Sequence, residues 1–206
     1  MTEDILAVLR RSQEWGFLGP GPVGGHIDHS QALIDLLHRH WPDGGLRGLD
    51  LGSGGGVPGL IVATALPHSR WTLLDAMDRR TAFLASATRS MGLTDRVEVV
   101  RDRAEVTGRD PNHRGNYDVV TARSFAVPAV TAECAAPFLR IGGLLVLSEP
   151  PDGDPSRWSH DGLATLGLDP APVDAQPWIS FRLVRECPER FPRQVGRPGK
   201  RPLWRP

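Results

Sequence analysis

Hydrophobic and polar residues follow two different patterns along the chain. Residues 5–15 and 26–41 carry apolar side chains at helical spacing. Between them the segment GFLGPGPVGG (16–25) is too rich in Gly and Pro for a helix or a strand. The first part of the chain is therefore predicted to form two helices joined by an irregular loop.

From residue 46 onward the pattern changes to short, nearly continuous apolar runs, which are typical of buried parallel strands. The predicted strands are residues 46–52, 70–76, 96–102, 117–123 and 142–149. Segments with helical spacing separate them, at 57–66, 78–91 and 127–140. Because strands and helices alternate, we expect an α/β fold with a doubly wound, mostly parallel sheet and helices on both of its faces.

The alternation stops after Pro150. A loop is predicted first, then a short helix over 158–168, and then a C-terminal strand over 178–187 that pairs antiparallel with one other strand. We interpret residues 1–206 as a single domain. Its parts are an N-terminal helical region (1–45), a Rossmann-like core (46–187) and a Pro/Arg-rich tail (188–206).

Composition narrows the class of protein only slightly. The formal net charge is zero and 40% of the residues are hydrophobic, as in ordinary soluble proteins. The N-terminus does not look like a signal peptide, and no apolar run is long enough to span a membrane. Cys134 and Cys187 have no spacing that indicates a disulfide framework. We therefore expect a cytoplasmic protein without a membrane partner.

Charge is unevenly distributed, because basic residues accumulate near the C-terminus. They outnumber the two acids in the same stretch, Glu186 and Glu189, and are Arg185, Arg190, Arg193, Arg197, Lys200, Arg201 and Arg205. Such a tail suits contact with the phosphates of a nucleic acid. Its prolines equally suit an extended strap that packs back over the domain and leaves the arginines in solvent. The sequence leaves both interpretations open.

The main candidate for chemistry is the loop DLGSGGGVPGL (50–60), which follows a predicted strand and opens a predicted helix. It contains the dinucleotide fingerprint G-x-G-x-x-G and equally a D-x-G-x-G pattern, formed by Asp50, Gly52, Gly54 and Gly56. Backbone N–H groups and the helix dipole at this position favour a negatively charged ligand group.

Two aspartates bear on the identity of the ligand, and only Asp50 discriminates between the two candidates. The carboxylate of Asp50 would repel a pyrophosphate but can pair, directly or through water, with an ammonium such as that of S-adenosylmethionine. Asp75, at the end of the second strand, is placed to accept both ribose hydroxyls of either ligand, although it also suits a helix cap. S-adenosylmethionine is therefore favoured over a nicotinamide dinucleotide.

Further segments extend this pattern along the chain. They are TLLDAMDRRTAFL (72–84), DRAE (102–105), YDVVTARSFA (117–126) and PERFPRQVGRPGKRPL (188–203). In this order, and together with the glycine loop, they resemble the RsmG or glucose-inhibited division protein B (GidB) family, whose members methylate N7 of a guanine in 16S ribosomal RNA. The resemblance implies a Rossmann-like class I methyltransferase fold, S-adenosylmethionine as cofactor and the small ribosomal subunit as partner.

The resemblance also implies roles for single residues. Gly52 and Val57 would contact the cofactor, Ala104 and Glu105 would lie beside its adenine, and Arg123 would lie next to the site of methyl transfer. The predicted cofactor-binding set is thus Asp50, Gly52, Gly54, Gly56, Val57, Asp75, Ala104, Glu105 and Arg123. Glu105 could equally be a charge in the first turn of a helix, and Arg123 a residue paired with a surface carboxylate.

Substrate contacts are predicted at two places. His26 and Arg123 are expected to line the pocket, and the basic tail is expected to contact phosphates through Arg193, Arg197, Lys200 and Arg201. No catalytic base is assigned, because guanine N7 carries a lone pair and no proton. The histidines of residues 26–40 lack a third well-placed ligand group, so no metal site is predicted.

The chain departs from the family pattern in three places. The family's N-L-T motif is absent, and GFLGPGPVGG stands in its place, where it is expected to form a lid over the cofactor cleft. His29 stands where an aspartate is usual, and Glu149 stands where a lysine is usual. These changes describe a divergent member. They leave open an alternative function, S-adenosylmethionine-dependent methylation of a small molecule or a protein.

Overall fold

The computed structural model describes residues 3–150, 153–173 and 175–205, including the side chains except that of residue 155. The helices are α1 (Ile5–Glu14), α2 (Gly24–His40), α3 (Gly59–Ala65), α4 (Asp78–Ser90), α5 (Ala104–Thr107), α6 (Pro128–Ala135), α7 (His160–Leu166) and α8 (Arg197–Lys200), with 3-10 turns η1 (Ala136–Phe138) and η2 (Pro155–Arg157). The strands are β1 (Arg47–Leu51), β2 (Arg70–Asp75), β3 (Val97–Arg101), β4 (Tyr117–Ala122), β5 (Leu139–Ser148), β6 (Leu168–Pro170) and β7 (Trp178–Leu183).

The described strands form one sheet in the order β3-β2-β1-β4-β5-β7-β6. Strands β1 to β5 run parallel, and β7 pairs antiparallel with β5. This arrangement confirms the predicted mostly parallel α/β fold with an antiparallel C-terminal strand. Strand β7 has two antiparallel neighbours rather than the predicted one, because the short strand β6 pairs with its other edge.

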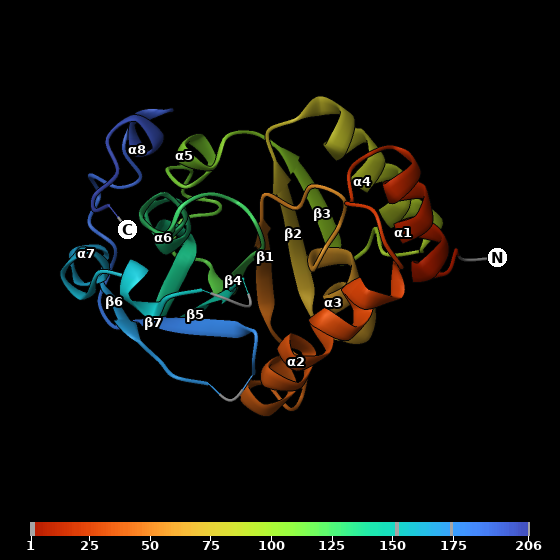
Figure 1. Cartoon of the computed structure of the whole chain (residues 1–206), viewed down its shortest axis with the longest axis horizontal. Coiled ribbons are helices and arrows are strands. Elements are labelled where there is room, and N and C mark those ends of the chain that lie inside the picture. Colours follow the sequence, from red (N-terminus) through yellow and green to blue (C-terminus); the bar gives the residue numbers. More distant parts are fainter. Residues whose placement is uncertain (1–2, 151–152, 174, 206) are drawn as a thin grey trace.

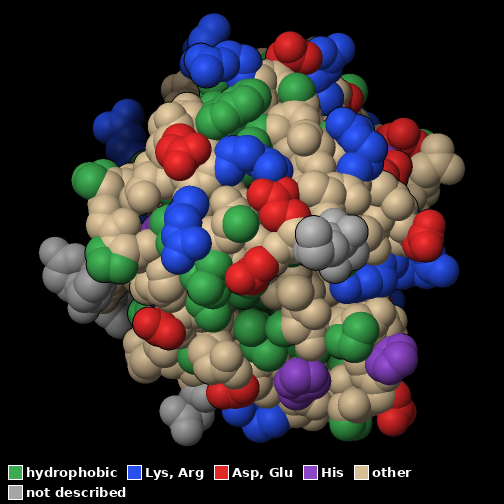
Figure 2. Space-filling view, turned by 90° about the vertical axis from the view of Figure 1, so that its right-hand side faces the viewer, with side chains coloured by type: hydrophobic (Ala, Val, Ile, Leu, Met, Phe, Trp, Pro, Cys, Tyr) green, Lys and Arg blue, Asp and Glu red, His purple; other side chains and the backbone are tan. Residues whose placement is uncertain are grey.

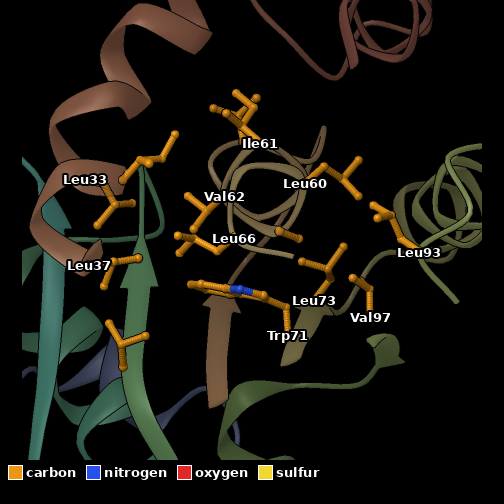
Figure 3. Packing of buried hydrophobic residues seen from close by; sticks show 14 of the residues in the cluster. Leu33, Leu37, Leu60, Ile61, Val62, Leu66, Trp71, Leu73, Leu93 and Val97 are labelled. Carbon is orange, nitrogen blue, oxygen red and sulfur yellow. The ribbon is translucent and has the colours of Figure 1, made fainter. Parts of the chain in front are cut away.

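Side chains that alternate along the central strands supply two hydrophobic cores. On β2, Trp71 and Leu73 belong to the core beneath α1 to α4, whereas Leu74 belongs to the core beneath α5 to α7. Figure 3 shows the Trp71 ring lying beneath Val62 and Leu66. Figure 1 shows the corresponding grouping of the helices, with α1 and α4 at one end of the molecule and α5 to α8 at the other.

The helix predicted over 127–140 is shorter in the structure. Helix α6 ends at Ala135, η1 follows, and β5 already begins at Leu139. Pro137 lies within η1, and its lack of an N–H and fixed backbone angle are unfavourable in a helix interior. Strand β5 is consequently ten residues long.

The C-terminal segment, residues 188–205, packs across α5 and α6 and is called the C-terminal strap below (Figure 1). Its Phe191 is 3% exposed. The Arg114 guanidinium donates to the carbonyl oxygens of Phe191 and Cys187, both at 2.7 Å. The strap interpretation of the tail is therefore correct for its backbone.

Candidate functional site

The predicted site residues gather at one edge of the sheet, beyond the carboxyl ends of β1, β2 and β4. The glycine loop follows β1, Asp75 is the last residue of β2, and Arg123 comes directly after β4. Parallel strands end at the same edge, which is where open α/β sheets bind ligands. The topology therefore brings together residues that are distant in sequence.

Asp75 fixes the glycine loop. Its Oδ2 accepts a hydrogen bond from the Gly54 N–H at 2.9 Å, and its Oδ1 accepts one from the Met77 N–H at 2.8 Å. Gly52, Gly54 and Gly56 have φ angles of 72°, 52° and 93°, in the region that residues with a Cβ adopt at a cost. The loop conformation therefore depends on these glycines and on the carboxylate that holds it.

Asp50 lies beneath the loop, with 1% of its surface exposed. Its Oδ2 accepts from the Gly59 N–H at 3.1 Å, and burial raises its pKa to about 7. A Cβ on Gly59 would lie 2.5 Å from that oxygen, so glycine is required where α3 approaches β1. Because Asp50 is so buried, the direct pairing with a ligand ammonium does not fit the structure, and contact through water stays a prediction.

A depression with a volume of about 210 Å³ lies beside the loop, between the ends of β2 and β3. Asp75, Ala104 and Glu105 line it, as does Phe125. Glu105 Oε1 accepts a hydrogen bond from the N–H of Gly196, at 2.9 Å. The strap thus fixes the side chain of Glu105, for which the family resemblance predicts a place beside the adenine.

A second depression, of about 270 Å³, lies between the loop and the N-terminal segment. Phe17, Leu18 and Gly19 line it together with the glycine loop. The Ser12 hydroxyl donates to the carbonyl of Gly55 at 2.9 Å and ties α1 to the loop. The segment 16–25 therefore begins over the glycine loop, where a lid was expected.

His26 and Arg123 lie in contact in this second depression. Arg123 Nη1 and His26 Nδ1 are 3.0 Å apart. Burial, with a smaller contribution from the Arg123 charge, lowers the pKa of His26, so the neutral imidazole accepts from the guanidinium. Two predicted substrate contacts thus meet, and His26 holds Arg123 in place.

The largest of these cavities, about 480 Å³, lies beyond the ends of β4 and β5. Arg123 and Phe125 form its border with the loop, and Glu149, Arg157 and Trp158 form another part of its wall. Arg157 Nη1 lies 3.5 Å from Glu149 Oε2. Burial raises the pKa of Glu149, while the Arg157 charge opposes that rise. Glu149 therefore faces a cavity rather than bulk solvent.

Sequence reasoning missed three residues of this border and wall. Phe125 lies so close to Gly52 that a Cβ there would be 2.5 Å from its ring. Its signal was its place inside the motif YDVVTARSFA, where only the arginine was selected. Arg157 and Trp158 follow Pro150 in a segment without any motif, and only the tertiary structure brings them to the site.

The tail residues divide into two groups. Arg197, Lys200 and Arg201 are exposed, as contact with phosphates requires. Arg193 instead donates its Nε and Nη2 to the two carboxylate oxygens of Glu133, at 2.8 and 2.6 Å. Glu133 is fully buried. Arg193 is therefore the anchor of the strap, and the prediction that it contacts phosphate does not agree with this placement.

No group of three or more His, Cys, Asp or Glu side chains among the described residues is arranged to hold a metal ion. No helix within the same residues has the length and apolar character needed to cross a membrane.

Comparison with known proteins identifies relatives of this chain. The profile of the family "rRNA small subunit methyltransferase G" (GidB) matches residues 26–149. "Ribosomal RNA small subunit methyltransferase G" of Synechococcus sp. (strain WH7803) is 38% identical over 197 residues, which cover 83% of this chain and 74% of the relative. The protein of the same name from Parasynechococcus marenigrum (strain WH8102) is 38% identical over 171 residues, covering 75% and 66%.

Solved structures agree on the fold. The cofactor-bound Rv0187 from MTB superimposes with a TM-score of 0.59 at 22% identity, covering 89% of this chain and 91% of the other. An O-methyltransferase from Bacillus cereus in complex with SAH gives 0.57 at 18% identity, covering 88% and 90%. The fold is that of Rossmann-like methyltransferases, and by its sequence the chain belongs to the rRNA small subunit methyltransferase G family.

Proposed function

We propose that this S-adenosylmethionine-dependent methyltransferase methylates N7 of a guanine in small-subunit ribosomal RNA. The relatives named above support the class of acceptor. The observation that carries the proposal is the 480 Å³ cavity, which meets the glycine-loop depressions at Arg123, Ser124 and Phe125. An acceptor cavity beside a cofactor cleft is the arrangement that transfer of a group between two bound molecules requires.

The residues of the cleft fit the cofactor. The backbone of Gly52 and Gly54 would hold the methionine end of S-adenosylmethionine near the start of α3. Both oxygens of Asp75 already accept one hydrogen bond each, and each has a further lone pair for a ribose hydroxyl. Ala104 and Glu105 line the depression where the adenine would lie. Val57, at the second depression, would complete the contacts.

The reaction depends on the positioning of the guanine and the cofactor and requires no proton transfer. When bound, the cofactor would supply a methyl group on a positively charged sulfur; the lone pair of guanine N7 would form the new N–C bond as the S–C bond breaks, leaving the neutral thioether and a positively charged base. Since N7 carries no proton, no general base is needed. Arg123, held by His26, lines both the acceptor cavity and the loop depression, and so it would orient the base against the cleft.

Binding of RNA is assigned to the surface of the strap. Arg197, Lys200 and Arg201 are exposed on and directly after α8. The face that carries α1 and α4 instead intermixes basic and acidic side chains (Figure 2). Contact with phosphates depends on an excess of positive charge, so the strap is the better candidate.

The proposal is tested with labelled S-adenosylmethionine and small ribosomal subunits from cells that lack the modification. The wild-type protein is expected to label small-subunit RNA, and borohydride reduction followed by aniline cleavage at the labelled guanine identifies N7. Asp75→Asn, which replaces a carboxylate oxygen of the ribose site by an amide N–H₂, should lose labelling and cofactor affinity together. Label found in metabolites or proteins of a fractionated lysate, with none in RNA, would contradict the proposal.

A further inference from the structure

The acceptor cavity contains a charged pair that no motif of the glycine loop requires. Glu149 follows β5, and Arg157 ends η2. Their side chains are 13% and 27% exposed, with Arg157 Nη1 3.5 Å from Glu149 Oε2. Both line the cavity. A carboxylate and a guanidinium held side by side offer a ligand two acceptors and an adjacent donor.

This arrangement of two acceptors beside a donor is complementary to one edge of guanine. The Watson–Crick edge presents the acceptor O6, the N1–H donor and the 2-amino donor, so Arg157 can donate to O6 while Glu149 accepts from both N–H groups. Adenine presents an acceptor at N1, which a carboxylate repels. We propose that Glu149 and Arg157 select guanine by reading its Watson–Crick edge, an inference that rests on the proposed function of this site.

The cavity also offers the apolar contacts that an unstacked base requires. Phe125 and Trp158 both line it. Protein sites that bind single unstacked bases commonly stack them on aromatic rings. The Trp158 indole N–H is buried and has no hydrogen-bond partner within hydrogen-bonding geometry among the described residues. Burial raises the pKa of Glu149, and the nearby Arg157 charge and Trp158 N–H partly oppose that rise. An additional donor is thus available beside the carboxylate.

The position of the pair suits the proposed reaction. N7 of guanine lies on the Hoogsteen edge, which shares only O6 with the Watson–Crick edge. A base held at Glu149 therefore keeps N7 free for the side of the cavity that carries Arg123 and Ser124, which also line the loop depression. The strap supports the wall, because the Trp204 indole N–H donates to the carbonyl of Arg157 at 3.0 Å.

The test compares Glu149→Gln with the wild-type protein on reconstituted small subunits that carry either guanosine or inosine at the methylated position. Inosine lacks only the 2-amino group. The wild type is expected to prefer guanine by about tenfold, the effect of one charge-assisted hydrogen bond. E149Q should lower kcat/KM for guanine at least about tenfold, lose most of that preference and leave the KM for S-adenosylmethionine unchanged.

Two further variants complete the experiment. Glu149→Asp keeps a carboxylate and should retain part of the preference for guanine even if its rate falls. Glu98→Gln, an exposed acid at the other end of the sheet, should behave as the wild type. Wild-type labelling of guanine with an unchanged preference in E149Q would overturn the role of Glu149. A wild type that labels no small-subunit guanine would instead overturn the proposed function.

Discussion

Asp50 is an acid in surroundings that oppose its charge. Burial raises its pKa to about 7, against 3.8 for an ordinary aspartate. The folded protein therefore binds the proton more tightly than the unfolded chain, and the contribution of Asp50 to stability decreases as the pH rises from about 4 to about 7.

This titration predicts the behaviour of Asp50→Asn, which keeps an oxygen for the Gly59 N–H but cannot ionise. Between pH 5 and pH 8 the wild-type free energy of unfolding should decrease relative to that of the variant. Urea denaturation of both proteins at the two pH values measures the difference. The lowered pKa of His26 acts in the opposite direction in both proteins and cancels in the comparison. Parallel pH profiles would contradict this assignment.

Several single residues of the site were predictable because short-range spacing defines them. The glycines of the loop and Asp75 each stand at the end of a predicted strand, whereas Arg123 was selected through the resemblance to the family. Their partners were not predictable, since the bond from Gly196 to Glu105 depends on how distant segments pack. The prediction that Arg193 contacts phosphate was wrong for the same reason. Its partner Glu133 lies in helix α6, and the sequence of that helix does not indicate that this carboxylate is buried.

At the scale of elements, the ion pair of Glu133 with Arg193 connects α6 to the strap. Removing one member of a buried pair leaves an uncompensated charge, so Arg193→Gln should lower the free energy of unfolding by about 3–5 kcal/mol. The double variant with Glu133→Gln should recover part of that loss. Urea denaturation measures both effects.

An exposed ion pair provides the matched control. Arg101 pairs with Asp78, and both side chains are more than half exposed. Arg101→Gln should therefore cost only about 0.2–1 kcal/mol. An equally small effect of Arg193→Gln would mean that the strap is not anchored through Glu133.

The longer elements were predictable from hydrophobic spacing, and the short ones were not. Helix α4 and strand β2 agree with the prediction to within one residue. Helices α5 and α8 and strand β6 have three or four residues each, too few for a periodic pattern to appear. The proline at 137, which separates α6 from β5, was a local signal that the sequence did offer.

At the scale of the whole molecule, the strap combines an anchored inner side with a basic outer side. Replacing Arg197, Lys200 and Arg201 by Gln should weaken RNA binding and reduce its dependence on salt, by a slope of about 0.7–0.9 for each phosphate that is no longer neutralised. Cofactor affinity should not change. Filter binding of small-subunit RNA over a series of salt concentrations measures the slope.

A control with the same change in charge uses Arg10, Arg70 and Arg89, which are exposed on other surfaces. Their replacement by Gln should leave the salt slope nearly unchanged. Equal slopes for the two triple variants would remove the strap from the RNA interface. Deleting the strap is a poorer experiment, because it also leaves Glu133 without its partner and Glu105 without its hydrogen bond from Gly196.

These anchors have a consequence for the order of events during synthesis. Helix α6 is translated well before Arg193, so its buried carboxylate has no counter-ion until the strap has left the ribosome. Glu105 likewise lacks its hydrogen bond until Gly196 has been translated. The cofactor cleft therefore reaches its final form only after the strap has been translated and has folded back onto α5 and α6.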